Sequence, residues 1–248
     1  YVSDAPLKFH LSGNFRGAQK TFEFEFPLDK ATTLNAFVPR LWASRKIGVL
    51  SDAIRDLGGN ADPTQPGVDV ARDPRFRELV DEVVRLSREF GILTEYTAFL
   101  ALEGTDLSKG AENLKSAIGN FQSRAIGTRS GWESLNQEMN RIQQKGQSSM
   151  NYGNGYIDEK MKQVSVSNVQ QIGDKTLYCR NGQWFDNAAL DEKGAVKADK
   201  VVKYGSPEYQ ELMQVLELNG RQGALSVGKD AIVKEKVNGE VFNFQVSW

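Results

Sequence analysis

The first long hydrophobic pattern along the chain has helical spacing and falls in residues 37–59. Its apolar residues recur every three or four positions: Ile47, Leu50, Ile54 and Leu57. Pro39 suits a first helical turn, where its missing N–H leaves no bond unmade. Gly58 and Gly59 are typical of a helix end. This stretch therefore predicts an amphipathic helix, followed by a polar loop over 60–72.

A second helix is predicted from residue 74 to residue 90. Asp73 is a good N-cap, Pro74 falls at the first helical position, and Gly91 can adopt the left-handed conformation that closes a helix. One apolar stripe runs along it: Phe76, Leu79, Val80, Val83, Leu86 and Phe90. The segment 92–102 is rich in β-branched and aromatic residues, so a strand is predicted there.

The N-terminal segment alternates between apolar and polar residues with a period of two. Leu7, Phe9 and Leu11 alternate before Ser12-Gly13-Asn14, where a turn is predicted. A second alternating run follows: Phe22, Phe24 and Phe26. Such alternation predicts two antiparallel strands with one buried face, as in a β-sandwich.

A third pattern runs through residues 107–142, where apolar residues repeat with a 4-3 spacing. This spacing predicts a long helix, or two, laid along another surface. Gly127 and Gly131 favour a break between them. We expect 107–125 to pack within the chain and the second half to face a protein partner through Trp132, Leu135, Met139 and Ile142. Alternatively, the whole stripe covers the chain's own sandwich and helices.

The remaining third of the chain predicts a linker and a small module. Residues 146–163 are rich in Gly, Ser and Asn, which is typical of a linker. Beyond them, Asn181-Gly182 and Asn238-Gly239 each separate two strand-like runs, and these pairs are strong hairpin signals. Ser206 and Pro207 predict a helix start between the hairpins.

These elements predict an α+β chain: a partial antiparallel β-sandwich covered by amphipathic helices, then a small α+β tail module. The predicted parts are 1–105 for the half sandwich and two helices, 106–145 for the heptad-patterned segment, 146–163 for the linker and 164–248 for the tail module.

Over about residues 7–102, and most specifically over 37–102, the chain resembles the region that follows the von Willebrand type A (vWA) domain in VIT/vWA proteins. That group includes the inter-α-trypsin inhibitor heavy chains and many bacterial surface or periplasmic proteins. The resemblance rests on RLWASRKIG and on LSREFGILTEYT, in which these residues match: Leu41, Trp42, Ala43, Ile47, Gly48, Leu86, Ser87, Gly91, Ile92, Thr94, Tyr96 and Thr97. Glu95 stands where the family usually has proline, and Ala98 where it has serine.

The resemblance implies a β-sandwich that the vWA domain interrupts and that the chain re-enters afterwards. The strands of 7–28 would be the returning half, and 92–102 would close the same sheet. The other half would lie in a segment ahead of Tyr1, so we expect the sequence to be a fragment or a processed product. The resemblance also implies a bacterial, extracytoplasmic protein whose partner is that preceding vWA/VIT segment or another subunit.

Composition excludes several classes of function. The net charge of −1 provides no basic field for nucleic acid. One Cys and one His allow neither a disulfide within the chain nor a zinc cluster, and the metal-binding D-x-S-x-S run of vWA domains is absent. No apolar run approaches the roughly 18 residues that span a bilayer. No catalytic motif occurs, so we expect no enzyme, no cofactor and no metal.

Single residues are assigned structural roles. His10 is expected to be structural, Cys179 a buried and inert thiol, and Trp42 and Trp132 core anchors. A basic group should form a solvated helix face: Arg40, Arg45 and Lys46. The predicted function is a non-catalytic structural or protein-interaction region of a vWA-type protein. The alternative is a dedicated accessory subunit of a larger, membrane-associated complex.

Overall fold

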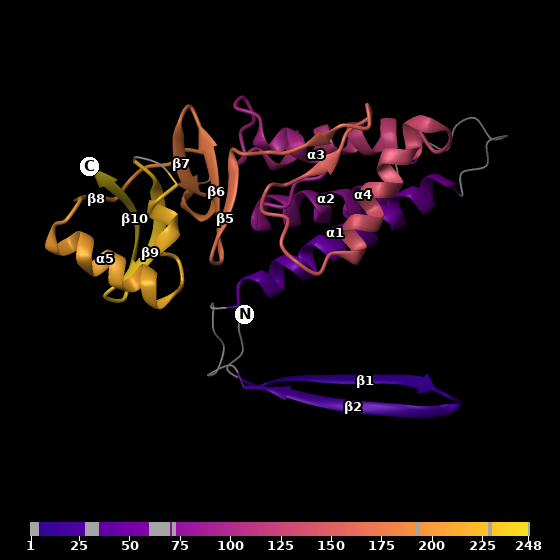
Figure 1. The fold of residues 1–248 in the computed structure, drawn as a ribbon, viewed down its shortest axis with the longest axis horizontal. Helices are drawn as coiled ribbons and strands as arrows, with labels where there is room; N and C mark the ends of the chain where they lie inside the picture. The colour runs from indigo at the N-terminus through magenta and orange to yellow at the C-terminus, as the bar shows by residue number, and fades with distance from the viewer. Residues whose placement is uncertain are drawn as a thin grey trace. The chain divides into compact units, whose positions relative to one another are not determined.

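The structure is a computed structural model and describes residues 5–27, 35–59, 70, 73–191, 194–227 and 230–247. The chain divides into two compact units, 1–35 and 36–248. Helices, a six-stranded mixed sheet and small antiparallel sheets confirm the α+β class (Figure 1). Most of the predicted loop at 60–72 lies outside the described residues.

The first unit contains one antiparallel hairpin, formed by β1 (Leu7–Phe15) and β2 (Ala18–Phe26). Its turn lies at Arg16 and Gly17, whose φ angles are 51° and 79°. Two successive positive φ values are typical of the tight turns that match strand twist. The turn predicted at residues 12–14 is therefore wrong, because these residues continue β1 and pair with Thr21, Lys20 and Gln19.

The second unit begins with two packed helices, α1 (Phe37–Gly59) and α2 (Pro74–Phe90). The Asp73 side chain accepts a hydrogen bond from the Arg75 amide at 2.9 Å, which caps α2 as predicted. Gly91 closes α2 with a φ of 64°, again as predicted. The predicted stripe of α2 packs against α1 in a cluster that includes Ile47, Ile54 and Phe76.

The strand predicted at 92–102 is wrong. Residues 95–97 form a turn, and the 3-10 helix η3 (Ala98–Ala101) follows. The Thr97 hydroxyl accepts a hydrogen bond from the Thr94 amide at 3.0 Å, and the Thr94 hydroxyl accepts one from the Tyr96 amide at 3.1 Å. Such local bonds between side chains and the backbone compete with a strand ladder, which explains why β-branched residues here form a turn.

The heptad-patterned segment is broken where its glycines fall. It comprises α3 (Gly110–Asn120), a π-helical turn η4 (Phe121–Ile126), the short 3-10 helix η5 (Trp132–Ser134) and α4 (Leu135–Gly146). Gly131, between η4 and η5, has a φ of 74°, which L residues rarely adopt. The break predicted near 127–131 is therefore confirmed.

The predicted linker at 146–163 is instead a packed segment. It contains the short strands β3 (Tyr156–Ile157) and β4 (Gln163–Val164), which pair with each other. Asn154 is buried and accepts a hydrogen bond from the Leu93 amide at 2.9 Å. The Ile157 amide donates to Asn140 of α4 at 2.8 Å. Asparagine side chains here accept hydrogen bonds from backbone amides of the folded unit. Amino-acid composition alone cannot distinguish such a packed segment from a linker.

The C-terminal part is a six-stranded sheet in the order β5-β6-β7-β9-β10-β8. Its strands are β5 (Val169–Ile172), β6 (Lys175–Arg180), β7 (Gln183–Asp186), β8 (Lys200–Lys203), β9 (Ile232–Val237) and β10 (Glu240–Ser247). Both predicted Asn-Gly hairpins are confirmed, between β6 and β7 and between β9 and β10. Three 3-10 and α-helical segments complete it: η6 (Asn187–Ala189), α5 (Pro207–Leu218) and η7 (Gln222–Leu225).

The sequence predicts a tail module tethered by a linker. The sheet is instead packed directly against the helical part. Gln171 donates to the Gly91 carbonyl, and the hydroxyls of Thr176 and Tyr178 donate to carbonyls at the end of α2. Residues 36–248 accordingly form one compact unit. Among the residues described, no helix is long and apolar enough to cross a membrane.

Candidate interaction surfaces and a buried polar pocket

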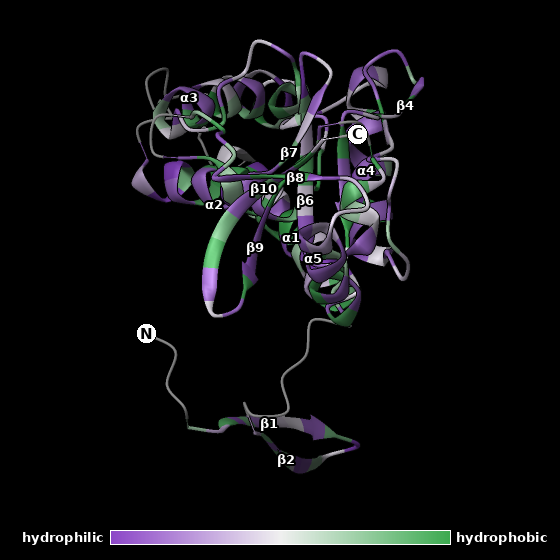
Figure 2. Cartoon of the chain, turned by 90° about the vertical axis from the view of Figure 1, so that its left-hand side faces the viewer, coloured by the Kyte–Doolittle hydropathy of each residue, from purple (hydrophilic) through white to green (hydrophobic). Residues whose placement is uncertain are grey.

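The hairpin of the first unit has two chemically distinct faces. Its register places Leu7 opposite Phe26, Phe9 opposite Phe24 and Leu11 opposite Phe22. The alternate positions carry the polar pairs Lys8–Glu25 and His10–Glu23, which alternate with the apolar pairs along both strands (Figure 2). One face is therefore almost wholly apolar. Its large side chains are about half exposed within the unit: Leu7, Phe9, Leu11, Phe15, Phe22, Phe24 and Phe26.

Helix α4 packs on the body through a polar face and exposes an apolar one. Asn136, Gln137 and Asn140 are buried beneath it. The predicted partner residues lie on the other side, where Trp132 is 69% exposed and Ile142 60%, with Leu135 and Met139 also exposed. A surface helix normally buries its apolar stripe. Here the apolar row is exposed instead. It consists of Trp132 in η5 and Leu135, Met139 and Ile142 in α4, and it is named the outer row of α4.

The polar side of α4 encloses the buried carboxylate of Glu95. Arg124 forms an ion pair with it at 2.7 Å, and the amides of Asn136 and Asn140 donate to it at 2.9 and 3.0 Å. Burial raises the pKa of Glu95, while these partners oppose the shift. Glu95 is the residue that replaces the proline of the resembled family. Its contacts connect the turn after α2 with η4 and α4.

Arg40 corrects the expectation of a solvated basic face. It is buried, and its guanidinium donates to the carbonyls of Gly173 and Lys175 at the start of β6. Burial lowers the pKa of Arg40 to about 10, although nearby Asp174 opposes the shift. Arg45 stays exposed and donates to the Gln147 carbonyl at 2.8 and 3.0 Å. Arg40 therefore joins the helices to the sheet.

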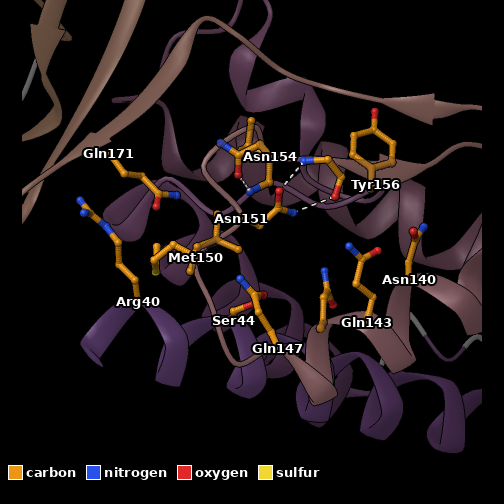
Figure 3. A pocket seen from close by; sticks show the side chains of 14 residues that line it. Arg40, Ser44, Asn140, Gln143, Gln147, Met150, Asn151, Asn154, Tyr156 and Gln171 are labelled. Atoms are coloured by element: carbon orange, nitrogen blue, oxygen red, sulfur yellow. Dashed lines mark hydrogen bonds between the residues drawn. The ribbon is translucent and has the colours of Figure 1, made fainter. Parts of the chain in front are cut away.

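Arg40 also lines a pocket rich in side-chain amides (Figure 3). Arg40 and Gln171 lie together on one side of it, and Asn151 and Asn154 lie farther along. Three buried side-chain atoms of the residues that line this pocket have no hydrogen-bond partner among the described residues: Arg40 Nε, Asn154 Nδ2 and Gln171 Oε1. The cavity volume is about 20 Å³, which suits one or two water molecules and nothing larger. The pocket therefore supports a structural role for these side chains.

A second buried polar cluster lies within the sheet. Lys175 contacts Asp186 at 2.8 Å and Glu235 at 3.6 Å. Arg221 contacts the same Glu235 at 2.6 Å and Asp174 at 2.5 Å. Sequence reasoning missed this cluster, because its members are ordinary charged residues up to 61 positions apart.

The other residues singled out from the sequence are spread over the chain. His10 is exposed in β1 and contacts Glu23 at 3.3 Å. Cys179 is partly buried in β6, and burial raises the pKa of its thiol. Trp42 is 53% exposed on α1, so neither it nor Trp132 is the core anchor that was predicted. In the described part of the chain, no group of three or more His, Cys, Asp and Glu residues is arranged to hold a metal ion.

Comparison with known proteins adds no relative. No protein-family model matches the chain, and neither a curated protein nor a solved structure is similar enough to count as a match.

Proposed function

We propose that this chain is a non-catalytic structural and protein-interaction region whose hairpin completes a β-sandwich with a sheet supplied by a partner. The observation that carries this proposal is the register of β1 and β2, which collects seven large apolar side chains on one exposed face. A two-stranded hairpin is at best marginally stable in water unless an apolar face is covered.

The chemistry of the hairpin defines what covers it. Fully burying one large apolar side chain contributes about 1.5–3 kcal/mol. Because this face has seven half-exposed ones, covering it with another apolar surface is strongly favourable. The opposite face carries the polar pairs Lys8–Glu25 and His10–Glu23, which favour water. A second sheet stacked at about 10 Å, with apolar residues facing the hairpin, matches this two-faced pattern.

The resemblance of residues 37–102 to VIT/vWA proteins supports one source for that sheet. In that family a sandwich is interrupted by the vWA domain and re-entered after it, so the covering sheet would belong to the segment that precedes the hairpin. On this proposal the protein is bacterial and extracytoplasmic. Because residues 92–102 do not form a strand, the expected returning half of the sandwich has one strand fewer. Among the described residues, that half consists of the hairpin of β1 and β2.

The proposal expects the gene to encode a vWA-containing segment ahead of residue 1, and the test uses that segment. Binding of residues 1–248 to that separately expressed segment is measured by titration calorimetry. Phe22→Ser combined with Phe24→Ser should weaken binding by about tenfold or more. The matched control, Glu23→Gln with Glu25→Gln on the polar face, should bind as the wild type does. Equal effects of the two pairs, or an upstream segment without a vWA domain, would count against the proposal.

A second candidate function is a dedicated accessory subunit of a larger complex. The outer row of α4 favours it, because its inverted orientation leaves an apolar strip of four side chains uncovered within its unit. To test this second function, proteins encoded by neighbouring genes are added to the chain one at a time. Gel filtration with light scattering then measures the mass of any complex. A chain that stays monomeric with each of them, while the hairpin segment binds, favours the first proposal.

A further inference from the structure

The buried cluster within the sheet brings an amine and a carboxyl into contact. Lys175 begins β6, Asp186 ends β7 and Glu235 lies in β9. The side chains of Lys175, Asp186 and Glu235 are only 8%, 3% and 5% exposed. Lys175 Nζ lies 2.8 Å from Asp186 Oδ2 and 3.6 Å from Glu235 Oε2. The nucleophilic atom and the carboxyl group therefore lie together in a site that excludes most water.

The sheet holds both groups in place. Leu177 pairs with Asp186, so Lys175, two residues before Leu177, points to the same face as Asp186. The other carboxyl oxygen of Asp186 accepts a hydrogen bond from the Ala188 amide at 3.0 Å. Lys175 Nζ also donates to the Lys234 carbonyl. With both partners restrained, most of the entropic cost of bringing them together has already been met in folding.

The third carboxylate lies next to the amine, with Glu235 Oε2 3.6 Å from Lys175 Nζ. Glu235 is held by Arg221 at 2.6 and 2.9 Å, and Arg221 also binds Asp174. This pairing fixes the Glu235 carboxylate in place beside the Lys175 amine. Taking a Lys–Asp ion pair out of water carries a large desolvation cost, and joining the two groups covalently removes both charges.

We propose that Lys175 and Asp186 condense to an amide (isopeptide) bond between β6 and β7, with Glu235 as proton relay. The Lys175 Nζ–Asp186 Cγ bond forms, and one Cγ–O bond of Asp186 breaks. Nζ gives up two protons, which leave with that oxygen as water, and Glu235 carries one of them from Nζ to the departing oxygen. The overall change is ammonium plus carboxylate to amide plus water. It balances without an oxidant, a reductant or any other reactant.

The experiment measures the mass of the folded wild-type chain, residues 1–248, after denaturation. The expected mass is lower than that of the sequence by one water, and proteolysis should yield one branched peptide that joins residues 175 and 186. Lys175→Arg and Asp186→Ala should each restore the full mass. Glu235→Gln should slow or abolish the loss of water while leaving both reacting groups in place.

The chain supplies a matched control in Lys145 and Asp52. Their side-chain atoms lie 2.6 Å apart, closer than in the buried pair, but they are 42% and 22% exposed and open to water. These residues should be recovered in separate, unmodified peptides. Recovery of Lys175 and Asp186 in separate, unmodified peptides from folded wild-type protein would overturn the proposal. So would a loss of water that maps to another peptide. Both decisions depend on the wild type alone, so a variant that fails to fold does not affect them.

Discussion

At the scale of single residues, exposure decides the role of each aromatic and charged side chain. Trp42 matches the resembled family and reads as an anchor, yet half of its surface is open within its unit. Phe76, on the neighbouring helix α2, is fully buried in the cluster between the helices. The two residues therefore differ in how much stability they contribute.

Trp42→Ala should lower the free energy of unfolding by about 1 kcal/mol or less, because the ring keeps much of its contact with water. Phe76→Ala, the control, should cost about 3–5 kcal/mol, since it removes a fully buried ring and leaves a cavity. Urea unfolding curves of both variants check this. A loss for Trp42→Ala as large as that for Phe76→Ala would show that a partner surface covers the tryptophan.

Glu95 predicts a dependence of stability on pH. Burial raises its pKa in the folded state above the ordinary value of 4.5. The folded state therefore holds the proton more tightly than the unfolded state does. The resulting stabilisation is fully present below about pH 4.5 and is lost as the pH rises through the folded pKa.

Glu95→Gln removes this titrating group but keeps an oxygen that can accept from Asn136 and Asn140. As the pH is lowered from 7 toward 4.5, the wild type should therefore gain unfolding free energy relative to the variant. Denaturant unfolding curves at several pH values measure this difference. Glu82→Gln is the control: Arg85 lowers the pKa of Glu82 below its ordinary value of 4.5, so its difference should stay nearly constant from pH 7 to 4.5 and turn against the wild type only below that. A difference for Glu95→Gln that is constant with pH would contradict the expectation.

At the scale of elements, α3 and α4 come from one heptad pattern but use it differently. Leu114, Phe121 and Ala125 of the first half are buried in the main helical cluster, whereas the outer row of α4 is exposed. The break at Gly131 permits this, because it lets the second half rotate relative to the first. That the outer row of α4 meets a partner stays a prediction.

Paired substitutions separate the two halves. Leu114→Asp with Ile118→Asp should unfold the chain, since an unpaired carboxylate in an apolar core is costly. Leu135→Asp with Met139→Asp should leave the circular dichroism spectrum and the melting temperature nearly unchanged, while weakening any assembly seen by light scattering. Unfolding by both pairs would mean that the outer row is covered by the chain itself.

At the scale of the whole molecule, the hydrophobic clusters found among the described residues all belong to the second unit. Three clusters serve its helices, its sheet and the junction between them. The first unit has a hairpin with an open apolar face instead. The stability of residues 36–248 should therefore not depend on residues 1–35.

A chain of residues 36–248 expressed alone should fold with a melting temperature close to that of the full chain, as followed by circular dichroism. It should also be more soluble, because the exposed apolar face of β1 and β2 is gone. A truncated chain that is unfolded would show that the hairpin supplies core contacts. Full-length protein carrying Phe22→Ser and Phe24→Ser is the control for solubility.

The amino-acid sequence by itself determined the local elements. Asp73, Gly91, Ser206 and the two Asn-Gly turns act on residues within a few positions of themselves, so their effects follow from the chain alone. The two-faced alternation of 7–26 is equally local, although the turn fell four residues later than predicted. The glycine break in the heptad pattern was local as well, but the spacing left open whether the second half faces outward, and the structure decided that it does.

Only the tertiary structure decided which polar residues are buried and what they meet. Arg40 binds carbonyls 133 and 135 residues away, and Glu95 meets amides 41 and 45 residues away. The packing of 146–163 onto α4, and of the sheet onto α2, depends on similarly distant partners. A buried charge is tolerated only where such partners converge, and that convergence is a property of the fold rather than of any local pattern.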